Sequence, residues 1–294
     1  MELRWLEDFV VLSETLNFSR AAERRNITQP AFSRRIRALE DWVGAGLVER
    51  TTHSVALNPS GQHFLAHARA VCFSLAQAKR EASELAKSTH TSLNIAATHA
   101  LSFTFIPEWL RQQNDVMSLG PLNLVSDSMQ ACENLMQKGE IDFLIAHAHP
   151  DAPSELQTPQ FQSRVIGHDQ LMAMISPSLA SQIKTTKHPA PYLAYSQESG
   201  LGRIIDATCK HTNTDGLAKA GFTSHLAATL LSMTKSGAGV AWLPESLAGR
   251  DRDTGQLEIF NPDFPTIALE IRISRPRQRL SKIAEELWSS LPLS

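Results

Sequence analysis

A cluster of arginines near the start of the chain is the part of the sequence best suited to bind another molecule through charge. Residues 20–37 hold six arginines and a single acid, Glu23, a local net charge of +5 in a chain whose formal net charge is −2. The six are Arg20, Arg24, Arg25, Arg34, Arg35 and Arg37. A guanidinium group binds phosphate oxygens and pairs with the acceptor atoms of guanine. The cluster favours a nucleic-acid partner, although a charge run is also typical of a solvated helix face.

Other residues that could do chemistry are sparse. The three cysteines are far apart and form no CxxC or Cys/His pattern, which argues against a zinc site and against structural disulfides. They are Cys72, Cys132 and Cys209. His99, His147 and His149 could act as acid–base groups, but no nucleophile elbow, P-loop or GxGxxG turn accompanies them. We therefore predict no catalytic residue, no metal and no cofactor, with an enzyme or a small-molecule-binding protein that does not act on DNA as the alternative.

Length and composition indicate the number of domains and the class of protein that carries these residues. A chain of 294 residues is long enough for about two domains, and 42% hydrophobic with 20% charged residues is ordinary globular composition. No apolar run approaches the ~20 residues that a membrane span needs. The N-terminus MELRWLEDF carries acids where a secretion signal would have basic residues. We expect a cytoplasmic protein without a membrane partner.

Three short helices are expected to carry the arginines. Apolar residues at helical spacing predict an amphipathic helix over residues 3–15. The stretch Asn17-Phe18-Ser19 is typical of a helix start, with Ser19 able to accept a bond from a free amide of a short helix that reaches Arg25. A third helix is predicted from Thr28, its N-cap, through Pro30 in the first turn to Gly44, which can end it.

The third helix has one apolar and one basic face. Its buried stripe is predicted to consist of Phe32, Ile36, Leu39 and Val43. At 100° per residue, Pro30, Arg34 and Arg37 lie roughly opposite that stripe and face outward. Two short helices joined by a tight turn, the second with an exposed basic face, are typical of a helix-turn-helix whose second helix enters the DNA major groove. Gln29 and Ser33 can contact base edges or phosphates, and Arg34 can do either.

A β-wing is predicted to follow this helix. Residues 47–50 and 54–57 are short strand-like runs on either side of Thr51-Thr52-His53. Arg50, at the end of the first run, would then lie beside the DNA backbone.

The stretch from residue 17 to 61, NFSRAAERRNITQPAFSRRIRALEDWVGAGLVERTTHSVALNPSG, resembles the winged helix-turn-helix of LysR-type transcriptional regulators. The most specific part is Ala21-Ala22, the run TQPAFS at 28–33 and Leu39-Glu40, whereas Val48 and Asn58-Pro59 depart from the pattern of the family. The resemblance covers essentially the whole chain and implies a double-stranded DNA operator as partner, with a contact to RNA polymerase. The DNA-binding residues that we predict are Ser19, Arg20, Thr28, Gln29, Pro30, Ser33, Arg34, Arg37 and Arg50.

A long helix is predicted to follow the wing. Asn58 can cap it, Pro59 suits its first position, and nothing breaks the pattern from Ser60 to Lys87, a length of about 40 Å. Apolar residues recur along it in steps of four and three: Phe64, Ala68, Val71, Leu75, Ala78, Ala82 and Leu85. Such a heptad seam needs a partner helix, and the alternative is a helix that lies on its own domain. The resemblance implies a homodimer through this linker helix, assembling further into a dimer of dimers.

From residue 93 onward, short apolar runs alternate with helical stretches, which indicates an α/β fold with largely parallel sheets. The resemblance implies two lobes like those of periplasmic binding proteins, joined by crossings near residues 146–150 and 262–267. We therefore expect a winged helix-turn-helix domain over residues 1–58, a dimerising linker helix over 59–88 and an effector-binding domain over 89–294. Lobe I would comprise about 91–147 and 267–294, and lobe II about 148–266.

Polar residues follow several of the predicted strands, where ligands bind in folds of this kind. The effector-binding residues that we predict are Thr98, His99, Ser102, Asp127, Ser128, Ser196, Ser199, Leu201, Arg203 and Ser224. Each hydroxyl taken alone is also typical of an ordinary helix cap. Arg203 could neutralise an anionic effector or pair with Asp206 on its own helix.

Three further segments resemble one branch of this family and bear on the signal to which the regulator would respond. IAATHALSFTFIP, YLAYSQESGLGRIID and GVAWLPE resemble the hypochlorite-responsive branch of the family, which implies sensing by methionine oxidation and a role in the oxidative stress response. Leu201 and Leu226 stand where that branch would place sensor methionines. The remaining methionines, Met129, Met136, Met172, Met174 and Met233, are more typical of core filling. The sequence thus predicts a LysR-type transcriptional regulator modulated by a small, anionic effector or by an oxidant.

Overall fold

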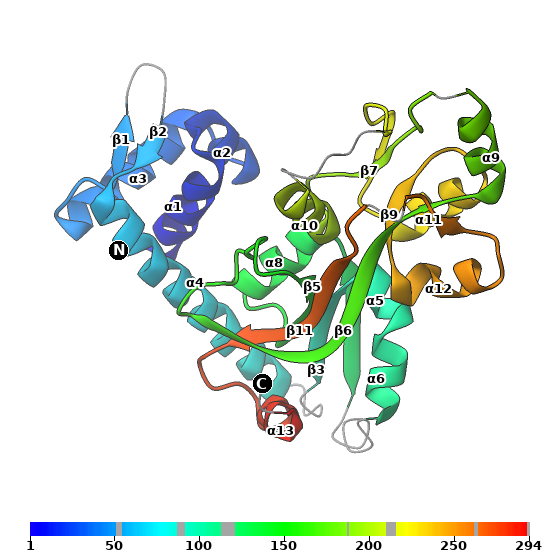
Figure 1. Cartoon of the computed structure of the whole chain (residues 1–294). Helices are drawn as coiled ribbons and strands as arrows, with labels where there is room; N and C mark the ends of the chain where they lie inside the picture. Colours follow the sequence, from blue (N-terminus) through cyan, green and yellow to red (C-terminus); the bar gives the residue numbers. More distant parts are fainter. Residues whose placement is uncertain are drawn as a thin grey trace. The chain divides into compact units, whose positions relative to one another are not determined.

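The computed structural model describes residues 1–50, 55–86, 92–112, 121–186, 188–209, 216–261 and 264–292. The chain divides into two compact units, the first made of Met1–Ser88 and Gln137–Glu140 and the second of Thr89–Met136 and Ile141–Ser294 (Figure 1). In the described ranges, no helix combines the length and the apolar character that a membrane crossing needs.

The first unit is a winged helix-turn-helix followed by a long helix. Its elements are α1 (Leu3–Thr15), α2 (Phe18–Arg24), α3 (Gln29–Val43), β1 (Val48–Arg50), β2 (Val55–Leu57) and α4 (Pro59–Ala86). The two strands pair antiparallel, with Val48 opposite Leu57, so the predicted wing is confirmed, while its turn at residues 51–54 lies outside the described residues. Phe32, Ile36 and Leu39 of the predicted stripe are fully buried with the apolar face of α1. Periodicity alone therefore predicted this core.

The helix ends follow local capping chemistry, with one correction. Asn17, not Ser19, caps α2, because its Oδ1 accepts hydrogen bonds from the amides of Ser19 and Arg20, both at 3.0 Å. Thr28 stands at the N-cap position of α3 but makes no capping bond through its side chain. Gly44 ends α3 at φ +78°, a conformation that favours glycine, and Asn58 Oδ1 accepts from the amide of Gly61 to start α4.

The predicted heptad seam of α4 divides between two environments. Phe64 packs against Phe9 of α1 with ring centroids 5.8 Å apart, and Ala68 is buried in the same core. These two positions therefore pack within the chain's own domain, and their predicted part in dimerisation stays a prediction. Val71 and Leu75 are 47% and 49% exposed. Ala78 and Ala82 are exposed as well, and nothing is described for the side chain of Leu85.

The second unit is built on a seven-stranded mixed sheet whose order is β10-β6-β11-β5-β3-β4, with β9 also paired to β6. Its strands are β3 (Leu93–Thr98), β4 (Leu122–Asp127), β5 (Phe143–Ala148), β6 (Phe161–Ile175), β9 (Ala241–Pro244), β10 (Glu258–Ile259) and β11 (Ile267–Pro276). The pairs β3–β4 and β3–β5 are parallel, whereas β11 runs antiparallel to both β5 and β6. The expectation of largely parallel sheets is therefore only partly right. A separate parallel pair joins β7 (Leu193–Tyr195) and β8 (Phe222–Ser224).

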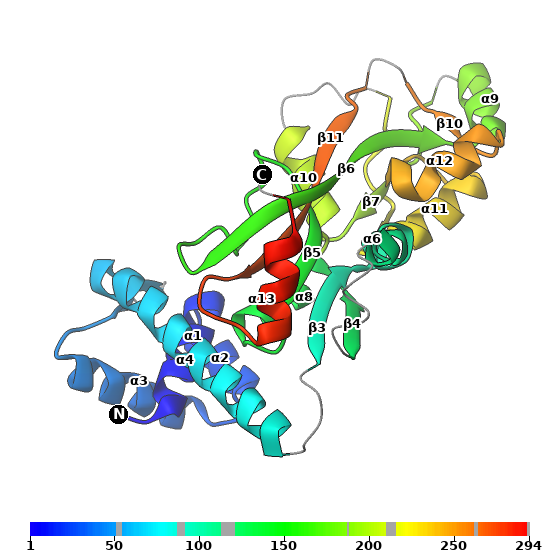
Figure 2. The same cartoon turned by 90° about the horizontal axis from the view of Figure 1, so that it is seen from below.

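Helices cover both faces of the sheet and complete two lobes (Figure 2). They are α5 (His99–Thr104), α6 (Ile106–Gln112), α8 (Met129–Gln137), α9 (Pro177–Thr186), α10 (Gly200–Thr208), α11 (Ala227–Lys235), α12 (Glu245–Asp253) and α13 (Lys282–Ser290). Because successive strand residues point to opposite faces, Ile95 and Ile145 pack with α6 and α13, while Ala96 and Leu144 pack with α8. A further core, around Trp242 and Ile204, belongs to the other lobe.

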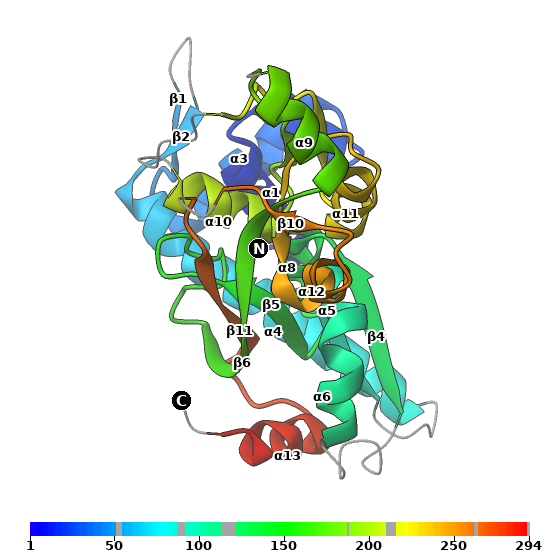
Figure 3. The same ribbon diagram turned by 45° about the vertical axis from the view of Figure 1, so that its right-hand side comes forward.

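The strands β6 and β11 run side by side and link the two lobes (Figure 3). After β5 the chain stays with the first lobe, since Leu156 and Phe161 pack in the same cluster as α8. It leaves along β6, which pairs with β11 as far as Leu171 and with β9 from Leu171 onward. The first crossing thus lies later than the predicted residues 146–150. The second predicted crossing ends where β11 begins, although residues 262–263 lie outside the described chain.

Candidate functional site

The six arginines divide into two groups according to their partners. Asp8 of α1 is fully buried, and its carboxylate binds Arg25 Nε at 2.6 Å and Arg35 Nη1 at 3.2 Å. Arg24 Nη1 lies 3.1 Å from a carboxylate oxygen of Glu14, also on α1. These three arginines therefore tie α2 and α3 to α1 and are engaged within the domain.

The second group faces solvent. Arg20, Arg34 and Arg37 are exposed, and no ion pair or side-chain hydrogen bond of theirs is seen within the described ranges. Gln29 and Pro30 are exposed beside them on α3, as are Ser19 and Thr28 nearby. All the predicted DNA-binding residues except Arg50 thus lie on α2, on α3 or in the turn between them, and no acid of the described residues pairs with Arg20, Arg34 or Arg37.

Two side chains, Arg50 and Glu40, join the wing to α2 and α3. The Arg50 guanidinium lies 4.4 Å from the centre of the Phe18 ring, and its Nη1 donates to Ser33 Oγ at 3.3 Å. Glu40 Oε1 accepts from the amides of Leu47 and Val48 at 2.9 and 3.1 Å, so α3 and β1 are joined directly. In the sequence Glu40 stands out only as part of the Leu39-Glu40 motif, which does not predict this role.

A small cleft of about 30 Å³ lies between the two lobes of the second unit. Six of the ten predicted effector residues line it, Thr98, His99, Asp127, Ser128, Ser199 and Leu201, together with His225, Met129 and His147. The hydroxyls Thr98 Oγ1 and Ser196 Oγ are buried and lack a hydrogen-bond partner among the described residues. A buried hydroxyl without a partner is costly, so both atoms are suited to bind a ligand or water.

The other predicted effector residues have different surroundings. Ser102, Ser196 and Ser224 are not among the residues that line the cleft. Ser102 Oγ donates to the carbonyl of His99 at 2.7 Å, and Ser224 Oγ accepts from the amide of Leu226 at 3.1 Å. Arg203 does not pair with Asp206. Its Nη1 binds the fully buried carboxylate of Glu133 at 2.8 Å and its Nη2 donates to Gln130 Oε1 at 2.6 Å.

Comparison with known proteins agrees with this geometry. Residues 86–292 match the family model of the LysR substrate binding domain, and residues 3–62 match that of the bacterial regulatory helix-turn-helix protein, lysR family. The chain belongs to the LysR family. This LysR-type regulator therefore combines a DNA-binding domain with an effector-binding domain, in a family of transcriptional regulators rather than of enzymes.

Relatives share this layout over nearly the full length. The HTH-type transcriptional regulator YjiE of Escherichia coli is 28% identical over 99% of this chain and 94% of its own. Among solved structures, DarR of Vibrio fischeri in complex with DNA is 30% identical, with a TM-score of 0.56 over 98% of this chain and 97% of DarR. Full-length HypT of Salmonella typhimurium, described as hypochlorite-specific, is 28% identical, with a TM-score of 0.57 over 98% and 96%.

His99, one of three histidines that line the cleft of this LysR-type regulator, has a lowered pKa. Burial lowers the pKa of His99, the Asp127 carboxylate opposes that shift, and the neighbouring His225 ring, 5.6 Å away between centroids, lowers it further. His99 Nδ1 lies 3.0 Å from Ser126 Oγ. A neutral imidazole offers one donor and one acceptor, so His99 can bind a polar ligand without carrying charge into the cleft.

A buried polar group at the junction of the lobes was not predicted. His147 Nε2 of β5 lies 3.0 Å from Asp169 Oδ2 of β6, and Ser246 Oγ of α12 donates to the same oxygen at 2.6 Å. Burial alone would raise the pKa of Asp169, but the hydrogen bonds from His147 and Ser246 outweigh it and the pKa is lowered. The serine contacts the carboxylate and not the imidazole, so the order is not that of a hydrolase triad.

The methionines and the side chains that could ligate a metal ion remain to be placed. Met129, Met136, Met172 and Met174 are all buried in the cores, and Met129 also lines the cleft. In the part of the chain that the structure describes, no three His, Cys, Asp or Glu side chains are grouped so that they could hold a metal ion. His225, Met129 and Asp169 had no local spacing signal, because each acts through residues far away in the sequence.

Proposed function

We propose that this LysR-type regulator reads double-stranded operator DNA with α3, and that Arg20, Arg34 and Arg37 face the duplex. The observation that carries the proposal is the division of the arginines. Acids of α1 neutralise one group, whereas no acid in the described chain pairs with the other. Arg50, held over Phe18 beside α3, lies at the base of the wing, where it could reach the DNA backbone, although its Nη2 already lies 3.6 Å from Glu40 Oε2. Ser19, Thr28, Gln29, Pro30 and Ser33 complete the proposed interface.

The proposed assembly is a homodimer through α4, with a dimer of dimers as the larger form. Val71 and Leu75 support it, because two large apolar side chains that remain about half exposed on one helix favour burial against another surface. Ala78 and Ala82 continue that stripe with small exposed residues. The two winged helix-turn-helix domains of such a dimer would then require half-sites separated by whole helical turns of DNA. RNA polymerase, in the cytoplasm with the chromosome, is the further partner of such a complex.

The proposed effector of the cleft is a small anion. A space of about 30 Å³ accommodates something near the size of a water molecule or a small ion. The unpaired hydroxyl Thr98 Oγ1 lines the cleft with the His99 ring and can donate to such a ligand. Ser196 Oγ is unpaired in the described chain as well but does not line the cleft. Nitrate should raise the midpoint of thermal unfolding of the full chain at constant ionic strength, and Thr98→Val should reduce that rise. An equal response of Thr98→Val and wild type would contradict the assignment.

An oxidant signal is the second candidate. HypT is described as hypochlorite-specific, and Met129 of this chain lines the cleft. Oxidation would turn an apolar side chain into a polar one at the junction of the lobes and could act in an oxidative stress response. Mass spectrometry after hypochlorite treatment would test the candidate. Met129, which lines the cleft, should oxidise before Met136 and Met174, which do not, and oxidation in the opposite order would exclude the candidate.

DNA binding of the full chain tests the main proposal. Fluorescence anisotropy would be measured with a duplex from the intergenic region upstream of the gene and with an unrelated duplex of equal length. Replacing Arg20, Arg34 and Arg37 by glutamine should lower affinity for both duplexes and flatten its salt dependence, because phosphate contacts release counterions. Arg250→Gln, at an exposed position on α12, is the matched control. Unchanged affinity and salt dependence in the triple variant would refute the proposal.

A further inference from the structure

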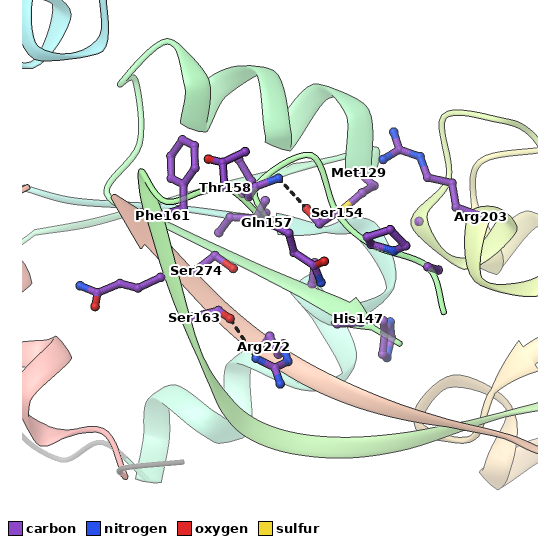
Figure 4. Close-up of a pocket in the computed structure, with 18 of the residues that line it drawn as sticks. Met129, His147, Ser154, Gln157, Thr158, Phe161, Ser163, Arg203, Arg272 and Ser274 are labelled. Carbon is purple, nitrogen blue, oxygen red and sulfur yellow. Dashed lines mark hydrogen bonds between the residues drawn. The ribbon is translucent and has the colours of Figure 1, made fainter. Parts of the chain in front are cut away.

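A second and much larger cavity, of about 460 Å³, lies in the effector-binding unit beside the cleft (Figure 4). Its walls come from α8, β5, β6, β11 with Arg277 after it, the segment of residues 152–158 and the first half of α10. The volume falls within the usual range for small-molecule sites, roughly 300–1,000 Å³. The cleft described above could hold an ion at most, so the two spaces must suit different ligands.

One part of the cavity wall is apolar. Met129, Leu144, Ala146, Leu156, Phe161 and Ile204 contribute hydrocarbon surface. Such a wall favours a ligand with an apolar body, because transfer of that body from water is favourable by about 25 cal/mol per Å² buried. Thr158 also lines the cavity, and its Oγ1 is buried without a hydrogen-bond partner in the described chain. It can serve as a donor to a polar group of the ligand.

The charged residues of the wall are all cationic. Arg203, Arg272 and Arg277 line the cavity, and no Asp or Glu is among the lining residues. Two of these arginines already have acid partners, since Arg203 binds Glu133 and Arg272 Nε binds Glu270 at 2.6 Å. Arg272 Nη1 also donates to Ser163 Oγ at 2.9 Å. Arg277 is exposed, and no side-chain partner of it is seen in the described ranges. The wall thus leaves one guanidinium uncompensated, which matches a single negative charge.

The geometry points to a second effector site that binds a small organic monocarboxylate with an apolar body. Its carboxylate pairs with Arg277 and its hydrocarbon part lies against Phe161 and Met129. α8 belongs to the first lobe and α10 to the second, so a ligand here touches both lobes next to the Arg203–Glu133 ion pair. Met129, His147 and Gly200 line both this cavity and the cleft, so occupancy of one site alters the wall of the other. Only this regulatory consequence rests on the proposed function.

Calorimetric titration of the full chain with octanoate, against the uncharged octanamide, tests the charge requirement. We expect saturable binding of one octanoate per chain and at least tenfold weaker binding of octanamide, since a guanidinium–carboxylate pair is lost. Arg277→Gln should weaken octanoate about tenfold, and the exposed Arg250→Gln on α12 should not. Absence of saturable octanoate binding, or equal affinities of wild type and Arg277→Gln, would overturn the proposal.

A blocking variant tests the location. Ser274 of β11 faces the cavity in Figure 4, and Ser274→Phe should fill it and abolish octanoate binding. If that variant unfolds, Ala146→Leu fills the same space from β5 with a smaller change. Octanoate binding that survives in a folded blocking variant would place the site elsewhere and overturn the proposal. Failure of the protein to bind duplex DNA would refute the proposed function and leave octanoate binding unaffected, so the two failures are distinguishable.

Discussion

The two units each bury a carboxylate that binds arginine, but in different contexts. Asp8 and Glu133 both have fully buried side chains. Asp8 holds Arg25 and Arg35, whose helices share one hydrophobic core with α1. Glu133 holds Arg203, and the helices of that pair belong to different cores. An ion pair inside one core breaks only when that core opens, whereas an ion pair between two cores can break while both stay folded.

The largest effect is expected from Asp8→Asn. It removes the charge that compensates two arginines in the core of the DNA-binding unit, which should cost about 3 kcal/mol of its unfolding free energy. Hydrogen exchange of the α1 and α3 amides under native conditions would measure that loss unit by unit. Glu14→Gln, at the partly exposed partner of Arg24, is the matched control. A loss below about 1 kcal/mol would mean that the buried carboxylate is not essential to this core.

A smaller and different effect is expected from Glu133→Gln. Loss of a charge-assisted bond should cost about 2 kcal/mol, and the cost should be local. Exchange should increase at the ends of α8 and α10 near the ion pair, while β3 and β9, in the two cores, keep their protection. If the whole effector-binding unit lost protection together, the ion pair would be part of one cooperative core, and the contrast with Asp8 would disappear.

The decrease of stability at low pH offers a third comparison, which concerns the effector-binding unit. The pKa of Asp169 is lowered in the folded chain, so its stabilising contribution is present above the ordinary carboxylate pKa and is lost as the pH falls through the lowered value. Asp169→Asn should therefore flatten the decrease of the thermal midpoint below about pH 4 for the effector-binding unit alone. If Asp169→Asn left the decrease of the thermal midpoint at low pH unchanged, other groups would be responsible for that decrease.

The smallest effect is expected from Arg24→Gln. The Arg24 side chain is 50% exposed, so its ion pair with Glu14 is screened by water. We expect a change within about 0.5 kcal/mol in urea unfolding, as is usual for surface pairs. A loss comparable to that of Asp8→Asn would show that exposure does not separate these arginines.

The sequence predicted what depends on local spacing. The bounds of α1, α3 and α4, the buried stripe of α3 and the stop at Gly44 all follow from periodicity and capping within a few residues. The expectation that polar residues after the strands lie together also holds for Thr98, Asp127 and Ser199, which line one cleft although they are far apart in the chain.

Long-range partners could not be predicted in this way. The sequence predicted no partner for Arg25 and Arg35, because Asp8 lies 17 and 27 residues away from them, on a helix whose acids would ordinarily face water. Likewise, the partner of Arg203 is 70 residues away, and the nearby Asp206 was the only acid that local spacing could suggest. The cavity beside the cleft is assembled from separate segments and left no pattern in any of them.

The central claim is that the arginines near the N-terminus are divided between DNA and the protein's own core. Operator affinity measured over a series of salt concentrations for Arg34→Ala and Arg35→Ala, together with unfolding of each variant, tests it most directly. Arg34→Ala should lose about 1–3 kcal/mol of binding, with a shallower salt dependence and wild-type stability. Arg35→Ala should instead lose stability, because it leaves part of the buried Asp8 carboxylate unpaired. Wild-type affinity and salt dependence in a stably folded Arg34→Ala protein would contradict the claim.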